Sequence, residues 1–243
     1  MSKLNVLLTG AAGRIGRTFT PPFSERYNLR TLDVVPNADN PEMLVGNLQD
    51  YALLESAMAG MDVVVHLAAT SDEAPFLEQL VPNNIIGLYN VYEAAYKAGV
   101  KRIVFASTCQ TVTAWSPDRL SFPESPIDVD APPRPVTIYG ATKVFGETLG
   151  RYYHDNRKME FVGIRIGYFL PYDLDKLRTH KYERNLWLSP RDAVRLFTLA
   201  IEKPDVGYAL VFGTSITEQE VLHREPALRL LGYQPEDDVR DLK

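Results

Sequence analysis

The sequence predicts an α/β fold built on a doubly wound parallel sheet. Short apolar runs at 4–9, 63–67, 103–106 and 161–166 have the length and composition of strands that are buried on both faces. Longer stretches with helical spacing of apolar residues separate them, at 14–26, 50–58, 84–98 and 139–154. Because strands and helices alternate, the strands are expected to lie parallel, with any ligand at their carboxyl ends.

Composition and charge limit the classes of protein that this chain can represent. The 243 residues are 45% hydrophobic and 23% charged, which is typical of one folded domain with a large core. A net charge of −5 argues against a nucleic-acid partner. The single cysteine, Cys109, excludes an intrachain disulfide, and the four histidines lack the spacing of metal ligands, so we expect no metal.

No apolar stretch approaches the roughly 18 residues of a membrane span. The apolar stretch near the N-terminus is too short and too interrupted for a signal peptide. These features predict a cytoplasmic protein without a membrane partner.

The remaining segments complete a single predicted domain over residues 1–243. A second strand is expected at 28–32, and the proline-rich stretch 115–136 is expected to form an ordered loop beside the active site. After residue 168 the sequence predicts a polar basic segment at 176–184, a helix from about 189, a strand near 209–212 and a last helix near 218–231. We expect 168–188 and 213–243 to form a small C-terminal substrate cap.

A glycine-rich loop directly after the first strand predicts a dinucleotide site of the Rossmann-like type. Glycines at 10, 13 and 16 permit a tight turn and let backbone N–H groups approach a pyrophosphate at the helix start. Gly10, Gly13, Arg14, Ile15 and Gly16 are the expected cofactor contacts in this loop.

An acidic residue, Asp33, ends the second strand about 20 residues beyond the glycine loop. Its carboxylate can accept hydrogen bonds from ribose hydroxyls and repels a 2′-phosphate, which favours NAD over NADP. Two alternatives stay open. In the first, Asp33 is a solvated turn residue before Pro36. In the second, Arg14 meets a 2′-phosphate.

Tyr139 and Lys143 stand four residues apart on a predicted helix, one above the other on the same face. A phenol ionises near pH 10, and a neighbouring ammonium favours the phenolate, which predicts that Tyr139 acts as a base. Taken alone, the pair is more commonly an exposed helix pair. The glycine loop, Asp33 and the hydroxyl residues Ser107 and Thr108 after the 103–106 strand favour the catalytic interpretation.

Seven segments together resemble the extended short-chain dehydrogenase/reductase family, also called the NAD-dependent epimerase/dehydratase family. They are TGAAGRIG at 9–16, Asp33, HLAA at 66–69, NIIGLYNVYEAA at 84–95, FAST at 105–108, YGATKVFGE at 139–147 and RIG at 165–167. The resemblance covers almost the whole chain. It implies a catalytic triad of Thr108, Tyr139 and Lys143, in which Thr108 is preferred to Ser107.

The same resemblance implies further contacts to NAD. Besides the glycine loop and Asp33, these are Asn47, Leu48, Leu67, Ala68, Ala69, Asn84, Tyr139 and Lys143. Asn47 stands where the family often has aspartate. For residues 67–69, the alternative to a cofactor contact is that they only pack within a strand.

The short stretch after Lys143 favours a small free sugar over a nucleotide-linked one. The segments NIIGLYNVYEAA, YGATKVFGETLGRYY and ERNLWLSPRD are similar to those of family members that oxidise uronates or glucose 6-phosphate at the anomeric carbon to a lactone. The resemblance therefore implies an NAD-dependent sugar dehydrogenase, an oxidoreductase, acting on a hexuronate, with glucose 6-phosphate as the closest alternative.

By this resemblance, Arg184 meets the substrate carboxylate, since a planar bidentate donor suits such a group. The other expected substrate contacts are Ser71, Thr108, Cys109, Gln110, Tyr139 and Tyr168. Cys109, Gln110 and Tyr168 depart from the residues of those family members, so they can change the sugar that is accepted. The alternative to a substrate contact is that Arg184 is one solvated arginine in a basic run.

Two other functions stay open from the sequence. One is a sugar epimerase or dehydratase with tightly bound NAD, and the other is a non-catalytic NAD-binding sensor, which the presence of both Tyr139 and Lys143 disfavours. Cys109 has no adjacent histidine and is not expected to be a nucleophile. Family members commonly pair through helices equivalent to 84–98 and 139–154, which implies a homodimer or a larger homo-oligomer.

Overall fold

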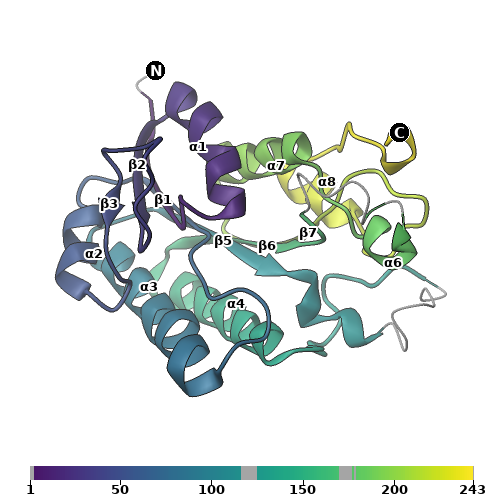
Figure 1. Cartoon of the computed structure of the whole chain (residues 1–243), viewed down its shortest axis with the longest axis horizontal. Helices are drawn as coiled ribbons and strands as arrows, with labels where there is room; N and C mark the ends of the chain where they lie inside the picture. Colours follow the sequence, from purple (N-terminus) through teal and green to yellow (C-terminus); the bar gives the residue numbers. More distant parts are fainter. Residues whose placement is uncertain (1–2, 116–124, 170–176, 178, 243) are drawn as a thin grey trace.

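A seven-stranded, entirely parallel sheet forms the centre of the molecule (Figure 1). The computed structural model describes residues 3–115, 125–169, 177 and 179–242. Across the sheet the strand order is β3-β2-β1-β4-β5-β6-β7, so the direction of winding reverses between β1 and β4. The strands are β1 Asn5–Thr9, β2 Asn28–Asp33, β3 Leu44–Val45, β4 Val63–His66, β5 Arg102–Thr108, β6 Glu160–Ile166 and β7 Tyr208–Gly213. The predicted doubly wound α/β fold is confirmed.

Helices cover both faces of this sheet. They are α1 Arg14–Arg26, α2 Tyr51–Met58, α3 Leu88–Lys97, α4 Ile138–Arg157, α6 Lys181–Arg184, α7 Pro190–Glu202 and α8 Glu225–Leu231. A wide π-helical segment, η1 Phe76–Gly87, precedes α3, and short 3₁₀ turns lie at η2 Cys109–Thr111, η3 Thr113–Trp115 and η4 Val239–Asp241. In Figure 1, α1 and α7 lie on one side of the sheet and α2, α3 and α4 on the other.

The core has two apolar layers because successive strand residues point to opposite faces. In β1, Val6 and Leu8 pack in the layer under α1 and α7, while Leu7 packs in the layer under α2, α3 and α4. The same alternation holds in β4, where Val64 faces the second layer. Burial on both faces explains why these strands read as continuous apolar runs in the sequence.

Two predicted element boundaries are wrong. The helix expected from residue 84 is preceded by the π-helical turns of η1, which contain Pro82. The last helix, expected from 218, begins only at Glu225. The residues before it form isolated parallel bridges instead, Ile216 with Asp238 and Leu222 with Ile127. The two-residue strand β3 was not predicted, since it is too short to show a pattern.

The proline-rich loop approaches the carboxyl end of β5. Residues 116–124 of this stretch lie outside the described part of the chain. In the described remainder, the backbone N–H of Arg134 donates to the Thr111 carbonyl at 2.9 Å, and that of Val136 donates to the Gln110 carbonyl at 3.2 Å. These bonds bring the loop beside the turn that follows Thr108 and lead it into α4.

The C-terminal part of the chain gathers beyond the carboxyl ends of β6 and β7. Tyr168 bridges to Trp187, and Arg184 forms an ion pair with Glu218 at 2.9 Å. These contacts lie within the predicted cap segments 168–188 and 213–243, whose function as a substrate cap stays a prediction. Within the described residues, no helix has both the length and the apolar character needed to cross a membrane.

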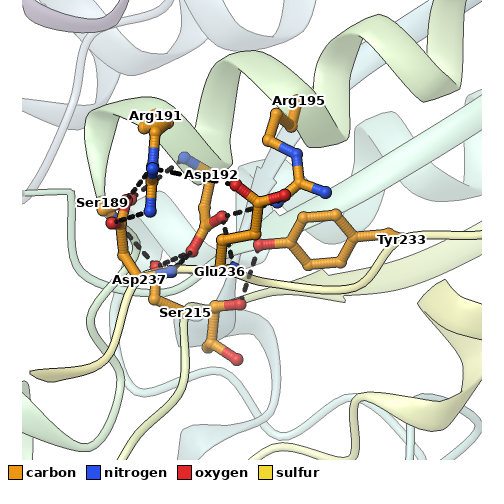
Figure 2. Close-up of polar contacts among 9 residues, drawn as sticks. Ser189, Arg191, Asp192, Arg195, Ser215, Tyr233, Glu236 and Asp237 are labelled. Atoms are coloured by element: carbon orange, nitrogen blue, oxygen red, sulfur yellow. Dashed lines mark hydrogen bonds and ion pairs between the residues drawn. The ribbon is translucent and has the colours of Figure 1, made fainter.

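A polar network around Asp192 joins this C-terminal segment to the start of α7 (Figure 2). Asp192 is fully buried, and its carboxylate accepts from the Ser215 hydroxyl at 2.7 Å and from the backbone N–H groups of Glu236 and Asp237 at 2.9 and 3.0 Å. Ser189 caps the helix by accepting from the Asp192 N–H and donates its own proton to Asp237 at 2.5 Å. The Asp192 network therefore fixes three separate chain segments to one another.

Candidate active site

The glycine loop lies between β1 and α1, where its glycines meet different local requirements. Gly10 has φ +76°, and a Cβ there would lie 2.6 Å from the Ala68 nitrogen. A Cβ on Gly16 would lie 2.2 Å from the Gly10 carbonyl oxygen, so only glycine fits at both positions. At Gly13, the N-cap of α1, a Cβ would lie 3.2 Å from the Gly10 carbonyl oxygen, which is a tight but less severe contact.

Asp33 fixes the glycine loop from the end of β2. One carboxylate oxygen accepts from the Ala12 N–H at 2.8 Å, and the other accepts from the Val35 N–H at 3.0 Å. The carboxylate thereby sits at the edge of a cavity of about 410 Å³ that extends along the carboxyl ends of β1, β2 and β4. This position suits recognition of ribose hydroxyls by the remaining lone pairs.

The cavity brings together most of the predicted cofactor contacts. Its lining includes Gly10, Gly13, Asp33, Asn47, Leu48, Leu67, Ala68 and Ala69. The lining also includes Val34, Val35, Gly46, Thr70 and Asn83, which sequence reasoning did not identify. Among the described residues, the predicted contacts Arg14, Ile15, Gly16, Asn84, Tyr139 and Lys143 lie outside this lining.

Asn84 connects the cavity wall to α4. Its side-chain oxygen accepts from the Thr70 N–H at 2.8 Å, and its nitrogen donates to the Thr70 carbonyl at 2.9 Å and to the Thr142 hydroxyl at 3.1 Å. All of its polar atoms are thus engaged with the protein. Asn84 holds the loop after β4 against α4, next to Lys143.

Tyr139 and Lys143 lie on α4 against the carboxyl end of β5, the strand that ends at Thr108. Lys143 is buried, and its ammonium donates to the Ala106 carbonyl at 2.8 Å. The same nitrogen lies 5.6 Å from the centre of the Tyr139 ring. The buried Thr108 side chain accepts from the Gln110 N–H at 3.3 Å.

The electrostatics of this group differ from the expectation. Burial raises the pKa of Tyr139 well above its usual value, and the charges of Asp72 and Cys109 act in the same direction. Burial also lowers the pKa of Lys143 to about 7, against the opposing effect of Glu147. The pKa of Tyr139 is therefore shifted in the direction opposite to the one expected from a neighbouring ammonium, and burial is the main cause.

Four of the predicted substrate residues lie near this group. Cys109 is buried in an apolar cluster, against which Tyr168 packs. The Gln110 side-chain oxygen accepts from the Thr137 hydroxyl at 2.7 Å and so helps to position the start of α4. Ser71 is exposed in the loop after β4.

Arg184, the predicted carboxylate ligand, is engaged with the C-terminal segment. Its Nε pairs with Glu218 at 2.9 Å, and Nη2 donates to the Val239 carbonyl at 2.9 Å. Two of its nitrogens are therefore already used within the protein.

Glu73 is a site residue that the sequence did not reveal. Its carboxylate accepts from the Ile138 N–H at 2.8 Å, directly before Tyr139, and so caps the N-terminus of α4. The contact spans 65 positions, and no local motif marks a cap supplied from that distance.

A glycine loop at the first βα turn, an acidic residue after β2 and a Tyr–Lys pair at the edge of a doubly wound sheet define a dinucleotide-binding enzyme of the Rossmann-like class. The chain belongs to the NAD dependent epimerase/dehydratase family, whose sequence pattern matches residues 6–186. The predicted family and its cofactor, NAD, are confirmed.

Sugar dehydrogenases are among the similar proteins. The chain is 36% identical to the NAD-dependent glucose-6-phosphate dehydrogenase of Haloferax volcanii, over 96% of this chain and 93% of that protein. It is 34% identical to the L-arabinose 1-dehydrogenase (NAD(P)(+)) of the same organism, over 96% of both. The crystal structure of a mutant uronate dehydrogenase from Agrobacterium tumefaciens complexed with NAD matches 98% of this chain and 86% of that one, with 32% identity and a TM-score of 0.82. The predicted class, an NAD-dependent sugar dehydrogenase, is confirmed.

Proposed function

We propose that this protein oxidises a free aldohexose derivative at its anomeric carbon to a lactone, with NAD as oxidant and a hexuronate as substrate. The observation that supports this most directly is the buried Lys143, which bonds α4 to the backbone of β5 two residues before Thr108 and lies beside the Tyr139 ring. Thr142, beside Lys143 on α4, accepts from Asn84, which in turn bonds Thr70 in the cavity wall. A proton acceptor thus adjoins a site that can hold a dinucleotide.

In this proposal each residue of the triad has a distinct task. The Thr108 hydroxyl hydrogen-bonds the reacting hydroxyl of the sugar, and Tyr139 removes its proton. In its charged form, the Lys143 ammonium offsets part of the cost that burial imposes on the Tyr139 phenolate. When bound, NAD accepts the hydride from the anomeric carbon.

The cavity fits NAD better than NADP. Its lining carries the Asp33 carboxylate, and none of the described lining residues is basic. The cavity reaches Gly13 at the N-terminus of α1, where backbone N–H groups can bind a pyrophosphate. A 2′-phosphate beside Asp33 would instead be repelled.

A hexuronate is supported by the similarity to a uronate dehydrogenase and by Arg184 in the C-terminal segment. To bind a carboxylate, Arg184 must share its guanidinium between the substrate and Glu218. Glucose 6-phosphate is the second candidate, because a glucose-6-phosphate dehydrogenase is 36% identical over nearly the whole chain.

The test is NADH formation with glucuronate, galacturonate, glucose 6-phosphate, glucose and L-arabinose, each with NAD and with NADP. We expect turnover of a uronate with NAD, weak turnover with NADP, and loss of turnover in Tyr139→Phe. Tyr152→Phe, an exposed tyrosine on the same helix, is the matched control and keeps its activity. Binding of NAD without turnover of any sugar would reject the dehydrogenase and favour an epimerase, a dehydratase or a sensor.

We also propose a homodimer that forms through α3 and α4. Large apolar side chains are exposed on these helices: Tyr89, Tyr96, Ile138 and Tyr152. Exposed apolar patches of this kind commonly mark protein interfaces. Sedimentation of the wild type and of Tyr89→Glu tests the proposal, which predicts a dimer that the charged variant dissociates; a wild-type monomer would reject it.

A further inference from the structure

Glu147 forms a buried ion pair one helical turn beyond Lys143. It accepts two hydrogen bonds from Arg165 of β6, from Nε at 2.9 Å and from Nη2 at 2.8 Å. The side chains of Arg165 and Glu147 are only 2% and 5% exposed. Such a bidentate pair has a well-defined geometry, which makes it a rigid link between α4 and β6.

Ser107 connects the same carboxylate to β5. Its hydroxyl donates to Glu147 at 2.5 Å, and it directly precedes Thr108 in the chain. Arg165 extends the network further, because its Nη1 donates to the Val129 carbonyl at 2.8 Å in the loop that leads to α4. A strand end, a helix, a second strand and a loop therefore meet at one carboxylate.

Tyr139, Lys143 and Glu147 are spaced four residues apart and so lie along one face of α4. Lys143 is bonded to the Ala106 carbonyl, and Glu147 to the next residue, Ser107. Two adjacent residues of β5 are thus attached to two successive turns of the helix. This double attachment sets where Thr108 lies relative to Tyr139.

Helix α4 packs so closely on the sheet that this arrangement has little freedom. A Cβ on Gly146 would lie 2.5 Å from the Phe105 ring, and one on Gly150 would lie 2.3 Å from the Phe161 ring. A helix in such contact can slide only if its polar attachments also change.

The stability of the fold does not by itself require a buried ion pair here. Removing two charges from water costs as much as their attraction recovers, and apolar residues of similar volume often serve equally well. The location of the pair is more informative, because Glu147 opposes the effect of burial on the Lys143 ammonium. Three other titratable groups lie close to Lys143 or Glu147: His66, Tyr139 and Arg165. Burial lowers the pKa of His66 to about 3, so this ring is uncharged near neutral pH. Tyr139 and Arg165 are then the other groups whose charge can affect this pair.

We propose that Glu147 is a positioning residue for the reaction. By holding Ser107 and Arg165 it fixes the Thr108 end of β5 against the helix face of Tyr139 and Lys143, and it places a negative charge one turn from the Lys143 ammonium. The kinetic part of the test rests on the proposed dehydrogenase activity.

The decisive variant is Glu147→Leu/Arg165→Met, which replaces the ion pair with apolar side chains of similar volume. We expect its Tm to stay close to that of the wild type, while kcat falls on the order of tenfold or more and the KM for NAD changes little. A double variant with wild-type kcat would overturn the proposal, since the pair would then be structural only.

Ser107→Ala is the second variant, in case the double variant does not fold. It removes only the link to β5 and should lower kcat with unchanged Tm. Thr148→Ala is its control, because this neighbouring hydroxyl on the exposed side of α4 bonds only within the helix. Equal kcat in Ser107→Ala, Thr148→Ala and the wild type would also overturn the proposal.

An NMR titration of the Lys143 side chain needs no sugar and separates this inference from the proposed function. We expect a lower pKa for Lys143 in Glu147→Gln than in the wild type, because this single change removes the carboxylate that favours the ammonium and leaves the Arg165 charge in place. If the wild type oxidises no sugar but this pKa falls, the proposed function fails and the charge interaction stands. An unchanged pKa would refute the interaction.

Discussion

Replacing Asp192 with alanine should destabilise the protein more than any other single change in the Asp192 network. The fully buried carboxylate accepts from the Ser215 hydroxyl and from two backbone N–H groups, at 2.7–3.0 Å. Its loss leaves these three donors to find new partners, each costing about 1–3 kcal/mol if it stays buried and unpaired. It also removes a longer contact from Arg195 Nη1 at 3.5 Å. Because water can reach part of the backbone, we expect a total of about 3–5 kcal/mol.

For a chain of this length, each kcal/mol corresponds to about 2–4 °C in Tm, so the midpoint should fall by about 6–20 °C. Urea and thermal unfolding, followed by circular dichroism, measure both quantities. Arg191→Ala is the matched control, since this arginine pairs with Asp237 but is 59% exposed, and its removal should cost less than about 1 kcal/mol. A loss in Asp192→Ala no larger than that of the control would refute the reasoning.

Three further predictions concern the cofactor site and the core. Gly16→Ala should lower both Tm and NAD affinity, because its Cβ would lie 2.2 Å from a backbone oxygen. Gly13→Ala, whose Cβ would lie 3.2 Å from the same oxygen, should weaken NAD binding with a smaller loss of Tm. Equal Tm losses, measured by calorimetry, would contradict this. Asp33→Asn should weaken NAD and narrow the preference over NADP in fluorescence titrations, and an unchanged ratio would count against the role of its charge. Burial lowers the pKa of His66 from 6.5 to about 3, so the unfolded chain gains a proton there as pH falls from 6.5 towards 3. The free energy of unfolding should thus drop by about 2 kcal/mol by pH 5, and His66→Gln should remove this slope while exposed His180→Gln keeps it.

The sheet was predictable because strands that are buried on both faces appear in the sequence as short apolar runs. The apolar run at 63–67 is too short for a buried helix and therefore predicts a strand. The glycines of the loop have the spacing that its turn requires. The predicted helix at 14–26 matches α1 at both ends even though Pro21 and Pro22 lie inside it. Here the apolar face formed by Phe19 and Phe23 outweighs the disfavoured prolines.

The details of the site depend on contacts between distant residues, which leave no local pattern. The cap that Glu73 provides for α4 and the link from Ser107 to Glu147 span 65 and 40 positions. Helix α8 begins later than predicted for a similar reason, since residues 216 and 222 pair with other segments of the chain. The direction of the Tyr139 pKa shift depended on burial, and spacing alone cannot report burial.

The two edges of the sheet bear on how the protein behaves at high concentration. An edge strand with free N–H and C=O groups is a template on which another chain can add a strand. At one edge β3 has only two residues, and Val45 is 52% exposed there, so an incoming strand would find few groups to pair with. At the other edge β7 packs against α8, which begins with a proline in its first turn and ends at Gly232. A short strand at one end and a helix at the other discourage the growth of fibrils from the native sheet.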